Sequence, residues 1–404
     1  MSALPVSPAT SDAVTGSFRT AATTKGAVNS NVSSQWWSRP DDQKFLSLDD
    51  LYAHTKGLAD VSHASIVETN KLRVIADRAD PRDLRLVNQT TGQEMQPSHY
   101  AFTQLASKVE AKPSFLRTLP GTIAGLVLQY KLMHYRPELL KAYARQDETN
   151  ELRAVTGPDY GRIFDHEIVE AVQRIAGNGT GDTRWKVPGM LDWSSQKGGT
   201  VTYNPFVDVT KQTTTLFASD RDVFLFLVDD THPIEIGKLP NGDPDLVFRG
   251  FYAYNSEVGD QKAGLATMYL RGVCCNRMLW GVEGFQEISI RHTKNAPVRF
   301  DAEAAPALKT YSEMATSKLL SGITDAKATV VARNDEDRLD FLLGQKFSKG
   351  QADAIIASVL NEEQTAPESI WDFVNGITAV ARTLPHQDAR IEMEKKASRL
   401  LARV

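Results

Sequence analysis

Between residues 200 and 293, hydrophobic and polar positions follow the pattern of successive β-strands. Six segments in this stretch are rich in β-branched and aromatic residues, and turn sequences such as HP, PNGDPD and GVEG separate them. Short turns indicate antiparallel strands, because parallel strands need a longer crossover connection. Residues 306–320 then show helical spacing. The pattern therefore predicts an α+β fold, with an antiparallel β-meander core closed by a long helix.

The region before this core, residues 46–150, is predicted to be mixed and mainly helical. Ser47 precedes two acidic residues and Ser98 precedes a second periodic run, so each serine is expected to cap a helix. A further helix is expected over residues 123–144 from the spacing of its apolar positions. Residues 1–45 contain few large apolar side chains and are predicted to form a disordered tail.

The pattern after the core, over residues 331–404, is helical. Residues 335–343 form one expected helix, Ser348 caps a second, and Pro367 fits the first turn of a third. The last segment, DARIEMEKKASRLLARV, has apolar residues at positions i, i+3, i+4 and i+7. The β-rich core domain is therefore placed at residues 151–330, between a mixed segment and a helical C-terminal region.

The overall composition is that of an ordinary soluble globular protein. Of the 404 residues, 41% are hydrophobic and 24% are charged. The mean hydropathy is -0.32 and there is no apolar run of about 18 residues, so no transmembrane helix is expected. The chain has 46 basic and 50 acidic residues, which give a net charge of -4. This balance excludes a basic coat over the whole surface but not a local basic groove.

The chain has two cysteines, Cys274 and Cys275, and they are adjacent. A disulfide framework needs separated pairs, and a structural zinc site needs a second ligand pair, so neither is expected. The first residues also lack the basic-then-apolar pattern of a signal peptide. These features together predict an intracellular, reducing location.

No motif for an enzyme is complete. The eight histidines are scattered, the Gly-rich turn AGNGTGDT lacks the Lys-Ser/Thr of a P-loop, and no GxSxG element is present. No catalytic residue, metal ion or other cofactor is therefore expected. A metal-dependent nuclease stays open as the second alternative, because four acids bracket one predicted strand, namely Asp220, Asp222, Asp229 and Asp230.

The second half of the predicted meander is locally basic. Between Arg271 and Arg299 the only acids are Glu283 and Glu287. Binding of single-stranded nucleic acid requires cations that neutralise phosphates and aromatic faces that stack on bases. The candidate DNA-binding residues are Arg271, Arg277, Arg291, His292, Lys294, Tyr254 and Trp280. A solvated sheet face with internal salt bridges is the alternative interpretation of the same residues.

The same stretch also carries particular residues at a recognisable spacing. In order, they are Asn255-Ser256, Gly259, Arg271-x-Val273-Cys274-x-Asn276, Gly281 and Ile290-Arg291-His292. The LRAV segment at 152–155, followed by Tyr160, and Trp371-Asp372 with Asn375 agree with them. Together they resemble the phage/plasmid-like family of unknown function, over about residues 151–401. One departure is Gly376, where that family usually has Ala.

The resemblance implies a protein of a bacteriophage, prophage or conjugative plasmid, located in the cytoplasm of a bacterial host cell. Separately, a meander followed by a helix resembles the core of the Rad-type and Erf-type single-strand annealing proteins, which form rings and hold DNA in a basic groove. The sequence therefore predicts a non-enzymatic protein that binds single-stranded DNA and promotes annealing or recombination. It is expected to act as a homo-oligomer, of which a ring is one alternative, and without contact to a membrane. The alternative is a protein-binding module that inhibits a host defence system.

Overall fold

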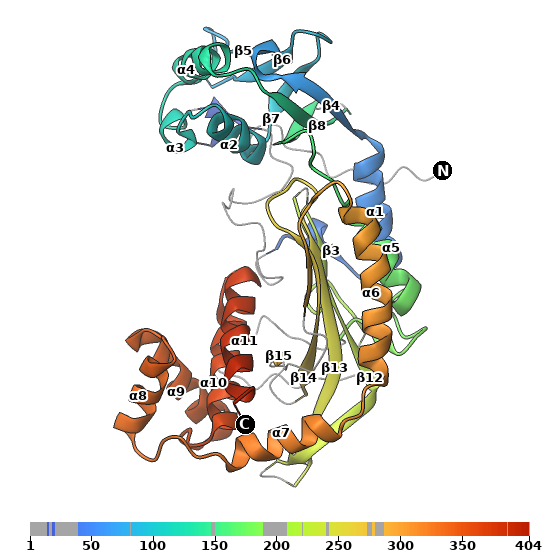
Figure 1. Ribbon diagram of the computed structural model, residues 1–404, viewed down its shortest axis with the longest axis vertical. Helices are drawn as coiled ribbons and strands as arrows, with labels where there is room; N and C mark the ends of the chain where they lie inside the picture. Colours follow the sequence, from blue (N-terminus) through green and yellow to red (C-terminus); the bar gives the residue numbers. More distant parts are fainter. Residues whose placement is uncertain are drawn as a thin grey trace.

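The computed structural model shows two β-sheets with helices packed around them (Figure 1). It describes residues 14–15, 18–20, 39–80, 82–146, 150–188, 208–219, 221–239, 242–272, 277–278, 287–385 and 387–403. Helices and antiparallel strands are both abundant among these residues. The predicted α+β class is therefore confirmed.

The larger sheet is the predicted antiparallel meander. Its strand order is β15-β14-β13-β12-β11-β3, with β10 beside β12 and β16 beside β14. The strands are β3 (Lys44–Phe45), β10 (Trp185–Lys186), β11 (Leu216–Ala218), β12 (Val223–Lys238), β13 (Pro244–Asn255), β14 (Ala263–Arg271), β15 (Arg277–Met278) and β16 (Glu287–Ile290). Strands that follow one another in the chain from β11 to β15 are neighbours in the sheet, as short turns require.

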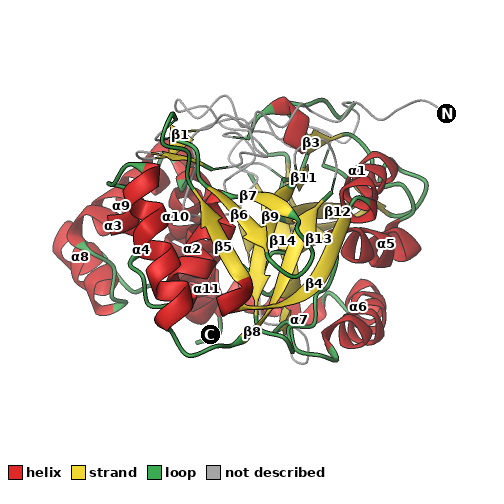
Figure 2. Ribbon diagram, turned by 90° about the horizontal axis from the view of Figure 1, so that it is seen from above, coloured by secondary structure: helices red, strands yellow, loops and turns green. Residues whose placement is uncertain are grey.

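Helices cover both faces of this sheet, namely α1 (Leu48–Asp60), α5 (Asp165–Ala176), α6 (Ala296–Glu313) and α11 (Gln387–Leu401). Figures 1 and 2 show α1, α5 and α6 on one face and α11 on the other. Leu225 and Phe251 point to the first face, whereas Phe226 and Met268 point to the second, where they pack with Ile391 of α11. Because both faces are covered, β14 is buried at every position.

The long helix that closes the core starts earlier than predicted. α6 covers Ala296–Glu313 instead of residues 306–320, and Pro306 lies inside the helix. Pro297 stands in the first turn, where a missing N–H costs nothing, and it marks the true start. A separate helix, α7 (Ser317–Ala328), follows α6.

Residues 46–150 contain both helices and strands, and their strands form most of a second, six-stranded sheet. The strand order is β4-β8-β9-β7-β6-β5. The strands are β4 (Ser62–Glu68), β5 (Leu72–Ile75), β6 (Arg85–Asn88), β7 (Glu94–Pro97), β8 (Leu139–Arg145) and β9 (Glu151–Thr156). The smaller sheet continues past the predicted boundary at residue 150, because β9 pairs with β8 and β7.

Three helices pack on the smaller sheet, namely α2 (His99–Lys108), α3 (Pro113–Leu116) and α4 (Gly121–His134). Their core includes Phe102, Leu105 and Leu128. Ser98 caps α2 as predicted, since its hydroxyl accepts a hydrogen bond from the N–H of Ala101. The helix predicted over residues 123–144 ends at His134, because Pro137 disfavours helical backbone before it and β8 begins two residues later.

The described part of residues 1–45 contacts both sheets. Two short strands pair with each other, β1 (Val14–Thr15) and β2 (Phe18–Arg19). Phe18 is fully buried, with its ring centroid 4.9 Å from that of Phe102. Arg39 is paired with Asp222, and Phe45 lies in β3 of the larger sheet. These few residues are therefore held by large or charged side chains, whereas the rest of the predicted tail, residues 1–13, 16–17 and 21–38, lies outside the described residues.

The C-terminal region is helical, as predicted. Its further helices are α8 (Asp335–Gly344), α9 (Lys349–Glu363) and α10 (Ile370–Thr383). Ser348 caps α9, where its hydroxyl accepts from the N–H of Gln351 and its own N–H donates to the Gln351 side chain. Ser369 caps α10 in the same way, so Pro367 lies before that helix and not in its first turn.

A buried polar cluster joins the smaller sheet to one end of the larger one. The Glu257 carboxylate accepts from Nη1 of Arg153 at 2.6 Å, from the hydroxyl of Tyr143 at 3.3 Å and from the N–H of Asp165 at 3.2 Å. Burial, followed by the charge of Glu257, raises the pKa of Asp165 well above its ordinary value. The side-chain N–H of Asn255 donates to the Asp165 carboxyl at 2.7 Å.

Gly376 lies where α10 approaches α9 closely. A Cβ atom there would stand 2.6 Å from Cγ2 of Val359 and 2.8 Å from the carbonyl oxygen of Ile355. We expect Gly376→Ala to lower the free energy of unfolding by about 1–2 kcal/mol, because overpacking outweighs the better helix propensity of Ala. Urea denaturation followed by circular dichroism measures the change. Gly350→Ala is the matched control, since a Cβ there meets open space; a Gly376→Ala protein at least as stable as wild type would contradict the packing argument.

Candidate nucleic-acid interface

The described residues of the predicted DNA-binding site do not form a basic groove. Arg271 lies in β14 with 3% of its surface exposed. Its Nε and Nη2 donate to Asp245 at 2.9 and 2.8 Å, and its Nη1 donates to Glu363 of α9. The guanidinium also stands 5.8 Å from the ring of Trp371 on α10. Arg271 therefore ties the sheet to the C-terminal helices, and its charge is not available to a phosphate.

The other predicted residues are dispersed. Arg277 is paired through its backbone in β15, and its side chain, like the whole of Trp280, lies outside the described residues. Arg291 and Lys294 are exposed in the loop that connects β16 to α6. Tyr254 is half-buried in β13, where its ring covers Gly264 of the neighbouring strand. Among the described side chains of the predicted set, Arg291 and Lys294 are the exposed cations.

His292 adds no positive charge at neutral pH. Its ring stacks on Tyr160 with the centroids 5.0 Å apart, and its Nδ1 lies 3.4 Å from the N–H of Ile163. Burial lowers the pKa of His292 to about 4, and the nearby Arg162 guanidinium also lowers it. The imidazole is therefore neutral and acts as a packing group between two loops.

The carboxylates considered for a nuclease are engaged with cations. Asp222 is paired with Arg39, Asp229 with Arg184, and Asp230 with Lys186, whereas Asp220 lies outside the described residues. Within the described ranges, no group of three or more His, Cys, Asp or Glu side chains is arranged to hold a metal ion. The same ranges contain no helix long and apolar enough to cross a membrane.

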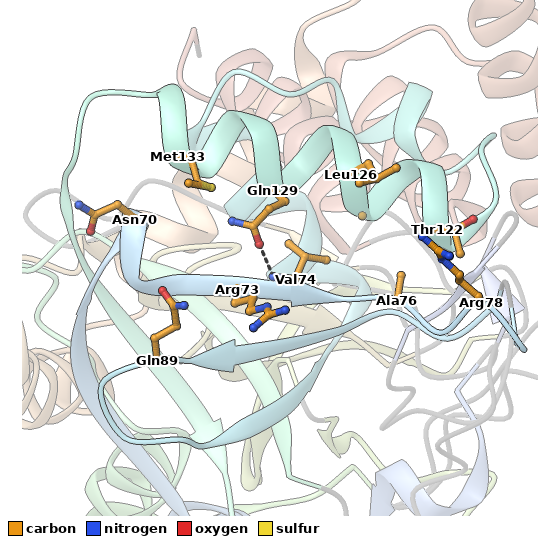
Figure 3. Close-up of a pocket in the computed structure, with 11 residues that line it drawn as sticks. Asn70, Arg73, Val74, Ala76, Arg78, Gln89, Thr122, Leu126, Gln129 and Met133 are labelled. Atoms are coloured by element: carbon orange, nitrogen blue, oxygen red, sulfur yellow. Dashed lines mark hydrogen bonds between the residues drawn. The ribbon is translucent and has the colours of Figure 1, made fainter.

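A groove with a cavity volume of about 440 Å³ lies between α4 and β5 (Figure 3). Its lining residues are Asn70, Arg73, Val74, Ala76, Arg78, Gln89, Thr122, Gly125, Leu126, Gln129 and Met133. They come from segments that are far apart in the chain, so no local pattern in the sequence marks the groove.

Two local features fix the helix against the strand. The side-chain oxygen of Gln129 accepts a hydrogen bond from the N–H of Val74 at 2.7 Å, as Figure 3 shows. Gly125 allows the close approach, because a Cβ atom there would lie 3.2 Å from the Cβ of Ala76 and 3.3 Å from Cγ1 of Val74. The hydrogen bond to the Val74 backbone and the small residues Gly125 and Ala76 therefore fix the floor of the groove.

One part of the groove lining is polar and cationic. Arg73 and Arg78 are both exposed, and neither forms an ion pair with any residue of the described chain. Gln89 is exposed beside them. The side-chain oxygen of Asn70 is buried and accepts no hydrogen bond from the described residues. These groups supply two unneutralised positive charges together with amides that can donate and accept hydrogen bonds.

The opposite side of the groove is apolar and unusually exposed. Leu126 and Met133 of α4 expose 68% and 62% of their surface. Tyr130, between them on the same helix, is 62% exposed, and its ring stacks on His134 with a centroid distance of 4.1 Å. Tyr130 and His134 are not among the lining residues, but their exposed rings on the same helix offer a face on which a base of a single strand can stack.

No protein-family model, curated protein or solved structure matches this chain. The resemblance to the phage/plasmid-like family therefore stays a prediction. A binding role of the α4–β5 groove is supported by the chemistry of its lining residues alone.

Replacement of Arg271 is expected to lower the stability of the folded protein. Arg271→Ala leaves the buried Asp245 carboxylate without its partner, so we expect a loss of about 3–5 kcal/mol in the free energy of unfolding. Chemical denaturation measures it. Arg291→Ala is the control for loss of one exposed arginine and should change stability by less than about 0.5 kcal/mol. Equal stability of the two variants would show that the Arg271 ion pairs are not structural.

Acid should destabilise the protein through its buried histidines. Burial lowers the pKa of His54, His99 and His292 from 6.5 to about 4. The unfolded chain therefore binds protons at these positions below pH 6.5, whereas the folded chain does not until about pH 4. The free energy of unfolding should fall as the pH is lowered through this window, and this contribution is fully present above pH 6.5.

Urea denaturation at a series of pH values between 7 and 4 tests this dependence. Carboxylates also lose stability in acid, so the informative comparison is with His292→Gln, which should show a shallower fall than wild type. Superimposable pH profiles for the two proteins would argue against a neutral, buried His292.

Proposed function

We propose that this chain is a non-enzymatic DNA-binding protein of a mobile genetic element, acting in the cytoplasm of a bacterial host. It binds single-stranded DNA through the α4–β5 groove and promotes annealing or recombination. The observation that carries the proposal is a groove lined by two exposed arginines, Arg73 and Arg78, that form no ion pair within the described residues, next to a helix, α4, that also bears the exposed Tyr130–His134 stack. Membership of the phage/plasmid-like family is part of the same proposal.

The dimensions of the groove suit a strand rather than a single small molecule. α4 has 14 residues and is therefore roughly 21 Å long at 1.5 Å per residue. One DNA strand in a duplex presents a phosphate about every 3.4 Å, so several phosphates can lie along the helix. Arginine binds phosphate oxygens through paired N–H groups, and stacking on an aromatic face is worth about 1–3 kcal/mol per base.

The sheet that carries the groove can also accept a protein. Four exposed side chains of α4 follow helical spacing on one side, namely Ile123, Leu126, Tyr130 and Met133. An apolar face of this kind is what an amphipathic partner helix contacts, with acidic residues of the partner near Arg73 and Arg78. This surface therefore favours a protein-binding module as the second candidate function.

Fluorescence anisotropy with a labelled single-stranded oligonucleotide across a salt series tests the DNA proposal. We expect binding at low salt that weakens as salt rises. Replacement of both groove arginines, Arg73→Ala with Arg78→Ala, should weaken binding. It should also reduce the slope of log K against log salt by about 1.4, that is about 0.7 for each phosphate contact of a single strand.

The matched control removes the two exposed cations of the sequence-predicted site, through Arg291→Ala with Lys294→Ala. Its affinity and salt slope should stay close to wild type. A strong loss in this control and none in the groove variant would place the DNA on the larger sheet. No binding by the wild-type protein at low salt would remove the DNA proposal and leave the protein-binding candidate.

A further inference from the structure

The two edge strands of the smaller sheet, β5 and β4, differ in what covers their outer backbone groups. At the β5 edge, the outward N–H of Val74 is bonded to the Gln129 side chain, and α4 packs along the strand. At the opposite edge, β4 pairs with β8 and with no other strand of the described chain. The β5 edge is therefore covered by α4, whereas the outward backbone N–H and C=O groups of β4 have no strand partner among the described residues.

β4 also has few of the residues that usually keep an edge strand from pairing, since its one acidic residue, Glu68, lies at its end. Its sequence is SHASIVE, which contains no Lys, Arg or Pro. Val67 faces the core, whereas Ile66 on the outer face is 52% exposed. Leu139, on the neighbouring strand β8, is 50% exposed on the same outer face. The four consecutive exposed residues of the strand are His63, Ala64, Ser65 and Ile66.

We propose that β4 is a dimerisation strand, which pairs antiparallel with β4 of a second copy of this chain across a twofold axis near Ser65. The pairing joins the two six-stranded sheets into one continuous sheet. The backbone groups that are unpaired in one copy become hydrogen-bonded to those of the other. Because the contact uses the same surface on both copies, it closes at two chains and does not by itself build a ring.

The side chains of β4 are complementary to themselves in this arrangement. With the axis at Ser65, Ala64 lies opposite Ile66 of the partner subunit, so a small residue faces a large one on the outer face. At the ends, Glu68 lies opposite Ser62 of the partner subunit, and no charge faces a like charge directly. A twofold axis perpendicular to the sheet also keeps the core-facing residues of both copies on one side. A second copy therefore satisfies the edge in both its backbone and its side chains.

Light scattering coupled to size-exclusion chromatography of the full chain tests the proposal. The wild-type protein should have about twice the chain mass of 44.6 kDa. Ile66→Lys should elute at the mass of one chain, because two lysines then stand diagonally across the axis. Ile66→Glu should do the same for the same reason. An equimolar mixture of the two variants should regain the mass of two chains, since each lysine meets a glutamate.

Val298→Lys is the control for a charge placed at an exposed apolar position, since Val298 is 75% exposed on α6, and it should remain a dimer. Circular dichroism of each variant confirms folding, and recovery of the dimer in the mixture separates a lost interface from a misfolded chain. The proposal is overturned if wild type has the mass of one chain, if Ile66→Lys keeps the wild-type mass, or if the mixture of the two folded variants stays monomeric.

Discussion

The ion pair between Arg153 and Glu257 joins the two sheets of this molecule, and both of its charges are buried. Arg153 belongs to β9 of the smaller sheet, and Glu257 directly follows β13 of the larger one. Burial of an unpaired charge costs several kcal/mol, so each residue holds the other in place. Tyr143 and Asp165 complete the hydrogen bonding of the carboxylate. This ion pair therefore helps to set the position of the α4–β5 groove relative to the meander, together with neighbouring contacts such as that of Gln104 with the carbonyl of Val258.

Several described residues that carry the family resemblance, including Asn255, His292 and Arg271, lie near this junction or in the ion pairs of the larger sheet. Asn255 donates to Asp165 and to the carbonyl of Ile163, while His292 stacks under Tyr160. These contacts are structural, because they hold loops and strand ends together at the junction. The exposed arginines that line a groove, Arg73 and Arg78, lie in and just after the edge strand β5 of the smaller sheet.

The placement of charge shows why the site could not be found from the sequence. Arg271 stands in a stretch that is locally basic, yet it is neutralised by Asp245 and by Glu363, which are 26 and 92 residues away. Arg73 has acids near it in the sequence but pairs with none of the described ones. Whether an arginine is available to a phosphate depends on which carboxylates the fold brings to it. Local charge density does not contain that information.

The sequence by itself determined the elements whose signals are local. The meander, its short turns, the caps at Ser47, Ser98 and Ser348, and the helical C-terminal region all follow from residues within a few positions of one another. Only the tertiary structure decided the smaller sheet, whose β9 comes from the predicted core, because strand pairing is a contact between distant segments. It also decided which charges are buried and which helix face is exposed, since burial is a property of the packed molecule and not of any one segment.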